Sequence, residues 1–157
     1  MSAPIAASPT HKPNLVRAVW LGEHRFDAGR PDGPVTRLDG SATTGQTPPD
    51  ALLSALAACS GVDVVDILAK RRTPVEALAI EVQGERRAEP PRRFVRLTVS
   101  YAIDGAGIER VHAERAVQLA FEKYCSVAAS LAPDTQVHTV VVLNGEAGES
   151  VPQKLTR

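Results

Sequence analysis

The chain is poor in several residue types that often define a function. Only two of its 157 residues are cysteine, one is tryptophan, one is methionine, and aromatic residues make up 4%. Two cysteines are too few for the disulfide frameworks of small secreted proteins. Eighteen basic residues balance eighteen acidic ones, so no net charge favours binding to nucleic acid or to a membrane. This length suits one domain with a substantial core.

Targeting segments are also lacking. Residues 1–13 have no apolar stretch of the signal-peptide kind, and no transmembrane segment is expected. We therefore expect a cytoplasmic protein. Its predicted organisation is a flexible N-terminal tail over residues 1–13, a single domain over residues 14–146 and a polar C-terminal tail over residues 147–157.

Motifs for metals, phosphates and hydrolysis are weak. The four histidines lack metal-ligand spacing, so we expect no metal and no cofactor; they are His11, His24, His112 and His138. A Cys-His hydrolase would need His112 or His24 beside a cysteine. Residues 105–107 lack the third glycine of a phosphate-binding loop. Five arginines fit either a solvated hairpin or a phosphate-binding patch; they are Arg86, Arg87, Arg92, Arg93 and Arg96.

The first cysteine lies in a long helical pattern. Thr47 can cap a helix that begins with two prolines, and Asp50 at the third helical position suits its N-terminus. The basic residues 70–72 favour the C-terminal end, and Thr73-Pro74 stops propagation. These signals predict one helix of about six turns that carries Cys59 near its middle.

Apolar residues surround this predicted helix on every side, at Leu52, Leu56, Val62, Val64, Val65, Ile67 and Leu68. Such a helix is buried on most sides, and either a second copy of the chain or the second helix of the same chain must cover it. Cys59 shares a face with two leucines and with Asp63 and Asp66. These neighbours do not indicate an activated thiolate at Cys59.

The second cysteine follows another helical pattern, over residues 108–131. A turn at residues 104–107 precedes it, and the pattern predicts a break at Cys125 with a short helix starting near Ser126. A helix N-terminus and the adjacent Lys123 would favour a Cys125 thiolate. The alternative is that both cysteines are packing residues, since free cysteine behaves as a small hydrophobe.

The remaining segments alternate as strands. Residues 17–26 and 35–38 are expected to form an opening hairpin joined by a turn-rich connection at residues 27–34. Residues 77–82 and 95–103 show two-residue alternation and form a second predicted hairpin, and residues 135–144 form the last predicted strand. The order of strands, buried helix, strands, helix and strand indicates an α+β fold.

Two segments resemble a known family. Residues 49–65 (PDALLSALAACSGVDVV) are similar to the cysteine helix of the OsmC/Ohr family, the osmotically inducible and organic hydroperoxide resistance proteins. Residues 121–127 (FEKYCSV) resemble its second cysteine site, in the variant of the YhfA-like branch. The likeness extends over residues 20–144.

The resemblance implies a two-layer α+β fold in which an antiparallel sheet wraps a long buried central helix, in an intertwined homodimer. It also implies reduction of organic hydroperoxides by Cys59 as the peroxidatic nucleophile, with Cys125 as the resolving thiol near the subunit interface. A small dithiol such as one of the lipoyl type would restore the pair. No bound metal or organic cofactor is implied.

The family's peroxidases place an arginine from the N-terminal strands and a glutamate from the helix start beside the reactive thiol. Asp50 stands in the place of this glutamate, and Arg25 or Arg30 would supply the arginine. Two functions follow from these residues. One is a thiol-dependent peroxidase; the other is a non-catalytic dimer that binds a small apolar molecule in the interface cleft and keeps its thiols as packing.

Overall fold

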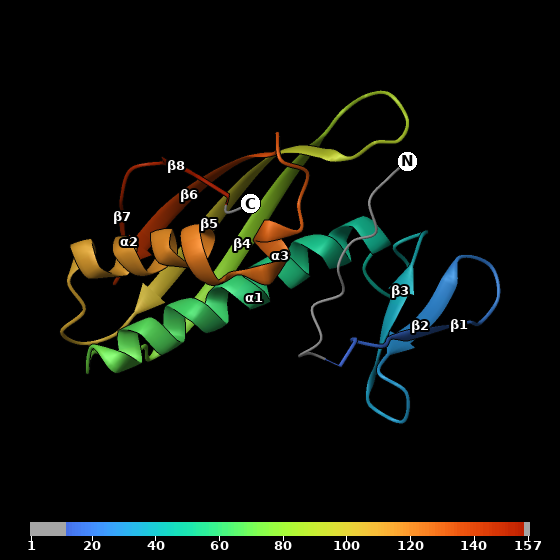
Figure 1. Ribbon diagram of the computed structural model, residues 1–157, viewed down its shortest axis with the longest axis horizontal. Coiled ribbons are helices and arrows are strands. Elements are labelled where there is room, and N and C mark those ends of the chain that lie inside the picture. The colour runs from blue at the N-terminus through green and yellow to red at the C-terminus, as the bar shows by residue number, and fades with distance from the viewer. Residues whose placement is uncertain (1–11, 156–157) are drawn as a thin grey trace. The chain divides into compact units, whose positions relative to one another are not determined.

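The computed structural model describes residues 12–155 (Figure 1). The chain forms two compact units divided between Pro48 and Pro49, and each is described separately. We call residues 12–48 the N-terminal unit and residues 49–155 the C-terminal unit. Almost all of the expected N-terminal tail, including His11, lies outside the described residues. The single domain expected over residues 14–146 stays a prediction.

The N-terminal unit is a three-stranded antiparallel sheet of β1 (Arg17–Trp20), β2 (Arg25–Gly29) and β3 (Val35–Asp39). The prediction of one strand over residues 17–26 is wrong at residues 21–24. There Gly22 (φ 99°) and Glu23 (φ 50°) adopt left-handed conformations that turn the chain back. The expected connection over residues 27–34 is correspondingly shorter, because β2 continues to Gly29.

Polar contacts organise this small sheet. Asp39 accepts hydrogen bonds from the backbone N–H groups of Ser41, Thr43 and Thr44, and from the Thr44 hydroxyl. The backbone bonds from Ser41 and Thr44 contribute most to a pKa of about 2 for Asp39, below the usual 3.8. Asp39 is also the one buried side chain among residues 12–48.

Helix α1 (Pro48–Lys70) starts at the last residue of the N-terminal unit, as the capping pattern predicts, and its other residues open the C-terminal unit. It is followed by β4 (Ala77–Arg86) and β5 (Phe94–Asp104). Next come α2 (Arg110–Leu119), the π-helical turn η1 (Ala120–Tyr124) and α3 (Ser126–Ala129). The last strands are β6 (Gln136–Leu143), β7 (Glu146–Ala147) and β8 (Val151–Gln153). Both β7 and β8 pair with β6, so part of the expected polar tail belongs to the sheet.

The five-stranded sheet is mixed. β4 pairs with β5 in an antiparallel register, whereas β5 and β6 are parallel because the second helical segment connects them. The expectation of a wholly antiparallel sheet is therefore wrong at this pair. Helices α1 and α2 lie on one face of the sheet, which gives the C-terminal unit two layers (Figure 1).

The hydrophobic core fills the space between these layers. Gly61 brings α1 close to β4, since a Cβ atom there would lie 2.7 Å from the Cδ1 atom of Ile80. Alternate residues of β5 and β6 turn toward the helices, as predicted for β5. The fully or almost fully buried members of this core include Leu56, Val64, Leu68, Leu97, Val99, Tyr101, Ile103, Ala116, Phe121, Val137 and Val141.

Helix α1 is less buried than its composition predicts. Leu56, Ser60, Gly61, Val64 and Leu68 face the core. The opposite face carries exposed apolar side chains, with Val62 at 60% exposure, and it borders an open hollow of about 660 Å³. We call Ala58, Val62 and Val65 of α1, with Leu78 and Ile80 of β4, the apolar face.

The length and composition of α1 bear on the expected absence of a membrane-spanning stretch. By length and composition alone, α1 could cross a membrane, and it is the only helix of the described residues that could. Core helices of globular proteins have the same properties, and α1 has five residues buried in its own unit.

Candidate thiol site

The structure brings the two cysteines together within one chain. Cys59 lies nearly three turns beyond Pro49 in α1 and is half-buried, whereas Cys125 lies between η1 and α3 and is buried. Their side chains are close enough for a hydrogen bond and for direct charge interaction. Neither thiol is in a disulfide. Sixty-five intervening residues thus fold so that two thiols share one site.

The surroundings of Cys125 favour the neutral thiol. Burial is the main reason that its pKa rises to about 11, and the neighbouring Cys59 adds to the rise. The backbone N–H of Ala128 donates to the Cys125 sulfur at 3.4 Å and opposes this shift only in part. The expectation that a helix N-terminus and Lys123 activate Cys125 is therefore wrong. The Lys123 ammonium instead lies 5.4 Å from the centre of the Tyr124 ring.

The π-helical turn η1 positions Cys125. The Cys125 backbone N–H donates to the carbonyl of Ala120, five residues back, at 2.7 Å. Such a wide turn places one more residue in the helix than regular α geometry would. The break at Cys125 agrees with the sequence pattern, whereas nothing in that pattern indicated the π geometry before it.

A buried polar pair adjoins the thiols. The Ser60 hydroxyl lies 2.7 Å from the Tyr101 hydroxyl and donates to the carbonyl of Leu56 at 2.8 Å. Burial is the main reason that the pKa of Tyr101 is raised, and the charge of a Cys125 thiolate would raise it further. Both hydroxyls are satisfied, so they fix the packing of α1 on β5 beside the sulfur atoms.

Asp63 of the C-terminal unit has a polar atom that remains unsatisfied. Its Oδ2 atom is buried, with no hydrogen-bond partner among the described residues. Burial, followed by the nearby Asp66, raises the pKa of the Asp63 carboxyl. Asp63 lies one turn beyond Cys59 on α1. Helical spacing in the sequence predicted that Asp63 and Cys59 share a face of α1. Only the folded chain shows that Asp63 Oδ2 has no hydrogen-bond donor among the described residues.

The other three candidate residues lie on different elements of the chain. Asp50 lies in the first turn of α1, nine residues or about 13 Å along the helix axis from Cys59. Arg25 in β2 and Arg30 in the following loop belong to the N-terminal unit. Arg25 forms an ion pair with Glu23 at 3.6 Å, and Arg30 is exposed. A role for any of these three at Cys59 stays a prediction.

The structure also bears on a metal site and on the arginine-rich hairpin. Within residues 12–155, no three His, Cys, Asp or Glu side chains gather as metal ligands. Arginines of the β4–β5 hairpin bind its own carbonyl groups, as Arg86 does at Arg92 and Arg87 does at Pro91. Arg93 pairs with Asp134. These contacts favour the interpretation of this region as a solvated hairpin.

Comparisons with known proteins agree with this architecture. A family model described as OsmC-like protein matches residues 39–140. Protein YhfA of Escherichia coli strain K12 is 34% identical over 116 residues, which cover 73% of this chain and 87% of that protein.

Solved structures are similar as well. A hypothetical protein from Aquifex aeolicus has a TM-score of 0.76 at 29% identity, covering 85% of this chain and 98% of that one. The organic hydroperoxide resistance protein OhrB of Bacillus subtilis has a TM-score of 0.54 at 18% identity, covering 83% of this chain and 96% of that one. At this identity, the second likeness concerns the fold alone.

Proposed function

The chain belongs to the OsmC-like protein family, and on this basis we propose that it is a thiol-dependent peroxidase that reduces organic hydroperoxides through Cys59 and Cys125. The observation that carries the proposal is the contact between the two thiols. A disulfide between Cys59 and Cys125 requires such nearness, which favours a redox pair over two unrelated packing residues.

The difference in burial supports the assignment of the two roles. Cys59 is the more accessible thiol, so its thiolate attacks the peroxide oxygen and becomes a sulfenic acid while the hydroperoxide leaves as an alcohol. Cys125 then attacks the Cys59 sulfur, forming the disulfide and releasing water. The raised pKa of Cys125 suits this order, because a neutral buried thiol does not compete for the peroxide.

The disulfide needs a reductant in every cycle. We assign this role to a small dithiol such as one of the lipoyl type, which reduces the Cys59–Cys125 bond and leaves as its own disulfide. The chemistry belongs to the protein sulfur atoms and needs no bound cofactor. The proposed location is the cytoplasm, where dithiol reductants keep such pairs reduced.

The proposal also includes a homodimer. The apolar face leaves Val62 at 60% exposure and Val65 at 40%, and a second copy would remove this area from water. In the dimer, either Arg25 or Arg30 would supply the positive charge that holds a Cys59 thiolate and orients the peroxide, and Asp50 would hold that arginine in place. Size-exclusion chromatography with light scattering tests the assembly. Val62→Glu should shift the protein toward the monomer, because it would bury an unpaired charge.

The redox test uses reduced protein with one equivalent of cumene hydroperoxide. Non-reducing mass spectrometry should detect an intrachain Cys59–Cys125 disulfide together with cumyl alcohol. Cys125→Ser should stop at an oxidised Cys59 that a sulfenic-acid probe labels. Cys59→Ser should leave the peroxide unconsumed.

A matched pair of variants separates activation from folding. Arg25→Gln and Arg30→Gln remove the same charge from neighbouring positions, and only the residue that assists Cys59 should slow peroxide consumption. Unchanged peroxide and two free thiols in the wild-type protein would reject the peroxidase. In that case the chain would be a dimer that binds a small apolar molecule in its interface cleft.

A further inference from the structure

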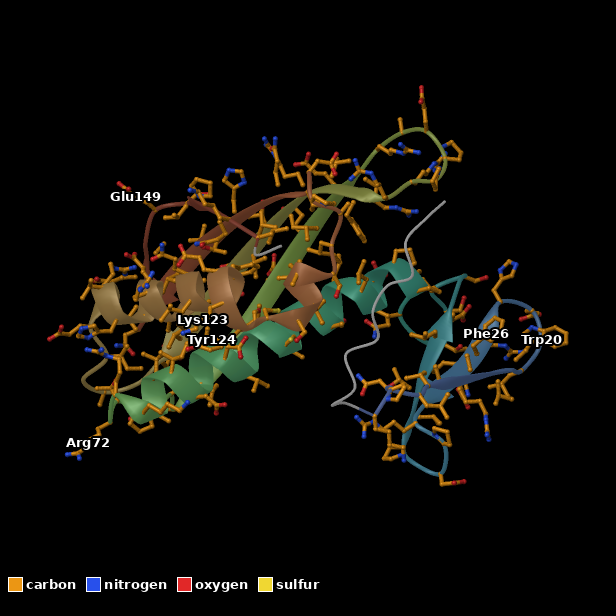
Figure 2. The ribbon with its side chains drawn as sticks, viewed as in Figure 1. Trp20, Phe26, Arg72, Lys123, Tyr124 and Glu149 are labelled. Atoms are coloured by element: carbon orange, nitrogen blue, oxygen red, sulfur yellow. The ribbon has the colours of Figure 1, made fainter. Side chains whose placement is uncertain are left out.

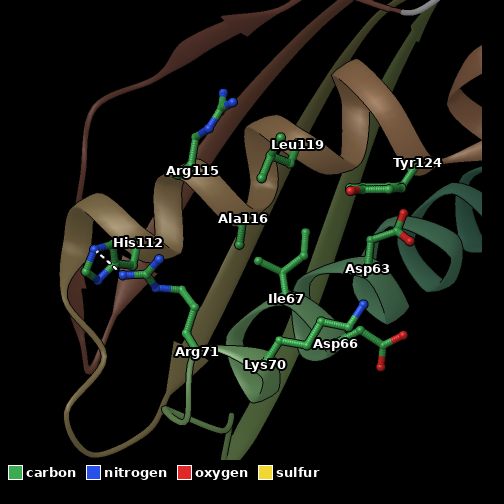
Figure 3. Close-up of a pocket in the computed structure, with 10 residues that line it drawn as sticks. All are labelled: Asp63, Asp66, Ile67, Lys70, Arg71, His112, Arg115, Ala116, Leu119 and Tyr124. Atoms are coloured by element: carbon green, nitrogen blue, oxygen red, sulfur yellow. Dashed lines mark hydrogen bonds between the residues drawn. The ribbon is translucent and has the colours of Figure 1, made fainter.

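A cavity of about 410 Å³ lies between α1 and the segment formed by α2 and η1 (Figure 3). Its volume falls in the range of small-molecule binding sites. Neither cysteine lines it, so it is separate from the thiol pair. All of its lining residues belong to the C-terminal unit, and they include two carboxylates and three cationic side chains.

The carboxylates and the Arg71–His112 pair occupy opposite ends of this cavity, and Lys70 reaches toward the carboxylates (Figure 3). Figure 3 shows Asp63 and Tyr124 at one end, and Arg71 and His112 at the other. Asp63 and Arg71 are eight residues apart, which corresponds to about 12 Å along α1. Between the two ends, Ile67, Ala116 and Leu119 provide an apolar lining.

The acidic end has an acceptor atom that no donor of the described residues reaches, although Lys70 and Tyr124 lie close to it (Figure 3). The buried Oδ2 atom of Asp63 has no partner among the described residues, and leaving such an atom unpaired is unfavourable. The neighbouring Asp66 adds negative charge rather than a donor. A cationic group of a ligand, which both donates a hydrogen bond and balances charge, satisfies this end.

The basic end is prepared for an anion. An Arg71 N–H donates to Nε2 of His112 at 2.6 Å, so the imidazole carries its proton on Nδ1. That Nδ1 atom lies 3.4 Å from Glu109. One side of the guanidinium is thus held in place while its other N–H groups remain available, and a guanidinium binds a carboxylate through two parallel bonds.

We propose that this cavity binds a short peptide-like zwitterion, with its ammonium group at Asp63 and its carboxylate at Arg71. An extended chain spans at most about 3.3–3.6 Å per residue, so two or three residues fit between the charged ends. The aliphatic lining selects small apolar side chains. This proposal does not depend on the peroxidase activity.

The test titrates reduced, full-length protein with trialanine, and compares N-acetyl-trialanine and trialanine amide, which each lack one charged end. Calorimetry measures affinity, and amide NMR locates the contact. Free trialanine should shift the signals of His112 and Tyr124. Each capped peptide should bind about tenfold more weakly or worse, because one charged hydrogen bond is lost.

Variants assign each end of the ligand. Asp63→Asn should weaken the binding of trialanine about tenfold. In this variant, acetylating the peptide should lower the affinity no further, since both changes remove the same ion pair between the peptide ammonium group and Asp63. Arg71→Gln should also weaken the binding of trialanine about tenfold, and in this variant trialanine amide should bind no more weakly than trialanine. Glu81→Gln and Arg72→Gln are the matched controls: Glu81 faces away from α1 on β4, and Arg72 does not line the cavity.

The peptide comparisons use wild-type protein and therefore remain informative even where a variant folds poorly. Equal binding of free and capped peptides would overturn the proposal. So would the absence of saturable binding up to about 10 mM, or NMR shifts confined to another surface. A cavity occupied by a second copy of the chain would give this negative result.

Discussion

The two units of the chain are stabilised in different ways. The C-terminal unit buries eighteen hydrophobic residues, from Leu56 to Leu143, between a sheet and its helices. The N-terminal unit buries only Asp39 among its described residues, and leaves Trp20 and Phe26 exposed (Figure 2). Hydrogen bonds can define the turns of a small sheet, but burial of apolar area provides most of the free energy of folding. The N-terminal unit therefore depends more on cover from outside itself.

The largest effect should come from truncating the core of the C-terminal unit. Leu97 is fully buried on β5, so Leu97→Ala should lower the free energy of unfolding by about 2–5 kcal/mol. Val19→Ala on the exposed β1 should change it by less than about 0.5 kcal/mol in a monomeric protein. Urea denaturation measures both. Equal losses would mean that the two units share one stabilising core.

A local effect should follow removal of the Asp39 carboxylate. Asp39→Ala takes away the acceptor of three backbone N–H groups, so the amides of Ser41, Thr43 and Thr44 should exchange faster with solvent. Hydrogen exchange read by NMR measures this change. Amides of β5 and β6 serve as the internal control, and their protection should remain within error of the wild type.

The two units should respond to opposite extremes of pH. The folded pKa of Asp39 lies below its usual value, so its stabilising contribution is present above pH 3.8 and is lost as the pH falls toward about 2. The folded pKa of Cys125 is raised, so its contribution is present below pH 9.0 and is lost as the pH rises through about 11.

Thermal unfolding across this pH range isolates the two groups when variants are subtracted from the wild type. In a plot of melting temperature against pH, Asp39→Asn should flatten only the fall on the acidic side. Cys125→Ser should flatten only the fall on the alkaline side. If the melting temperature of Asp39→Asn fell at low pH as steeply as that of the wild type, the turn after β3 would contribute nothing to stability in acid.

The smallest expected effect is a gain in thermal stability. The folded state disfavours the ionised Asp63 carboxyl, so Asp63→Asn should raise the melting temperature slightly at neutral pH. Glu81→Gln controls for the loss of one acidic charge. A lower melting temperature in Asp63→Asn would mean that the carboxylate has a stabilising partner in solution.

Local signals in the sequence predict some features well. The bounds of α1 follow from Thr47, the two prolines and the basic end, all of which act within one helical turn. The break at Cys125 and the alternation of β5 are also local patterns. Both are confirmed by the structure.

Features that depend on distant segments were not predictable in this way. The turn at residues 21–24 relies on a left-handed Glu23, which no strong preference requires. The parallel register of β5 and β6 depends on where the connecting helices pack. The thiol of Cys125 has its pKa set by burial under other elements, so its neighbours in the sequence gave the wrong direction.

The extra residue in η1 makes the thiol site tolerant of one change in chain length. The Cys125 N–H already bonds the Ala120 carbonyl across this turn, so deleting one residue from within it would let the same bond close with regular α-helical spacing. Cys125 would then keep its place beside Cys59. A residue deleted from the regular helix α2 has no such turn to absorb it, and it would rotate the residues that follow by about 100°.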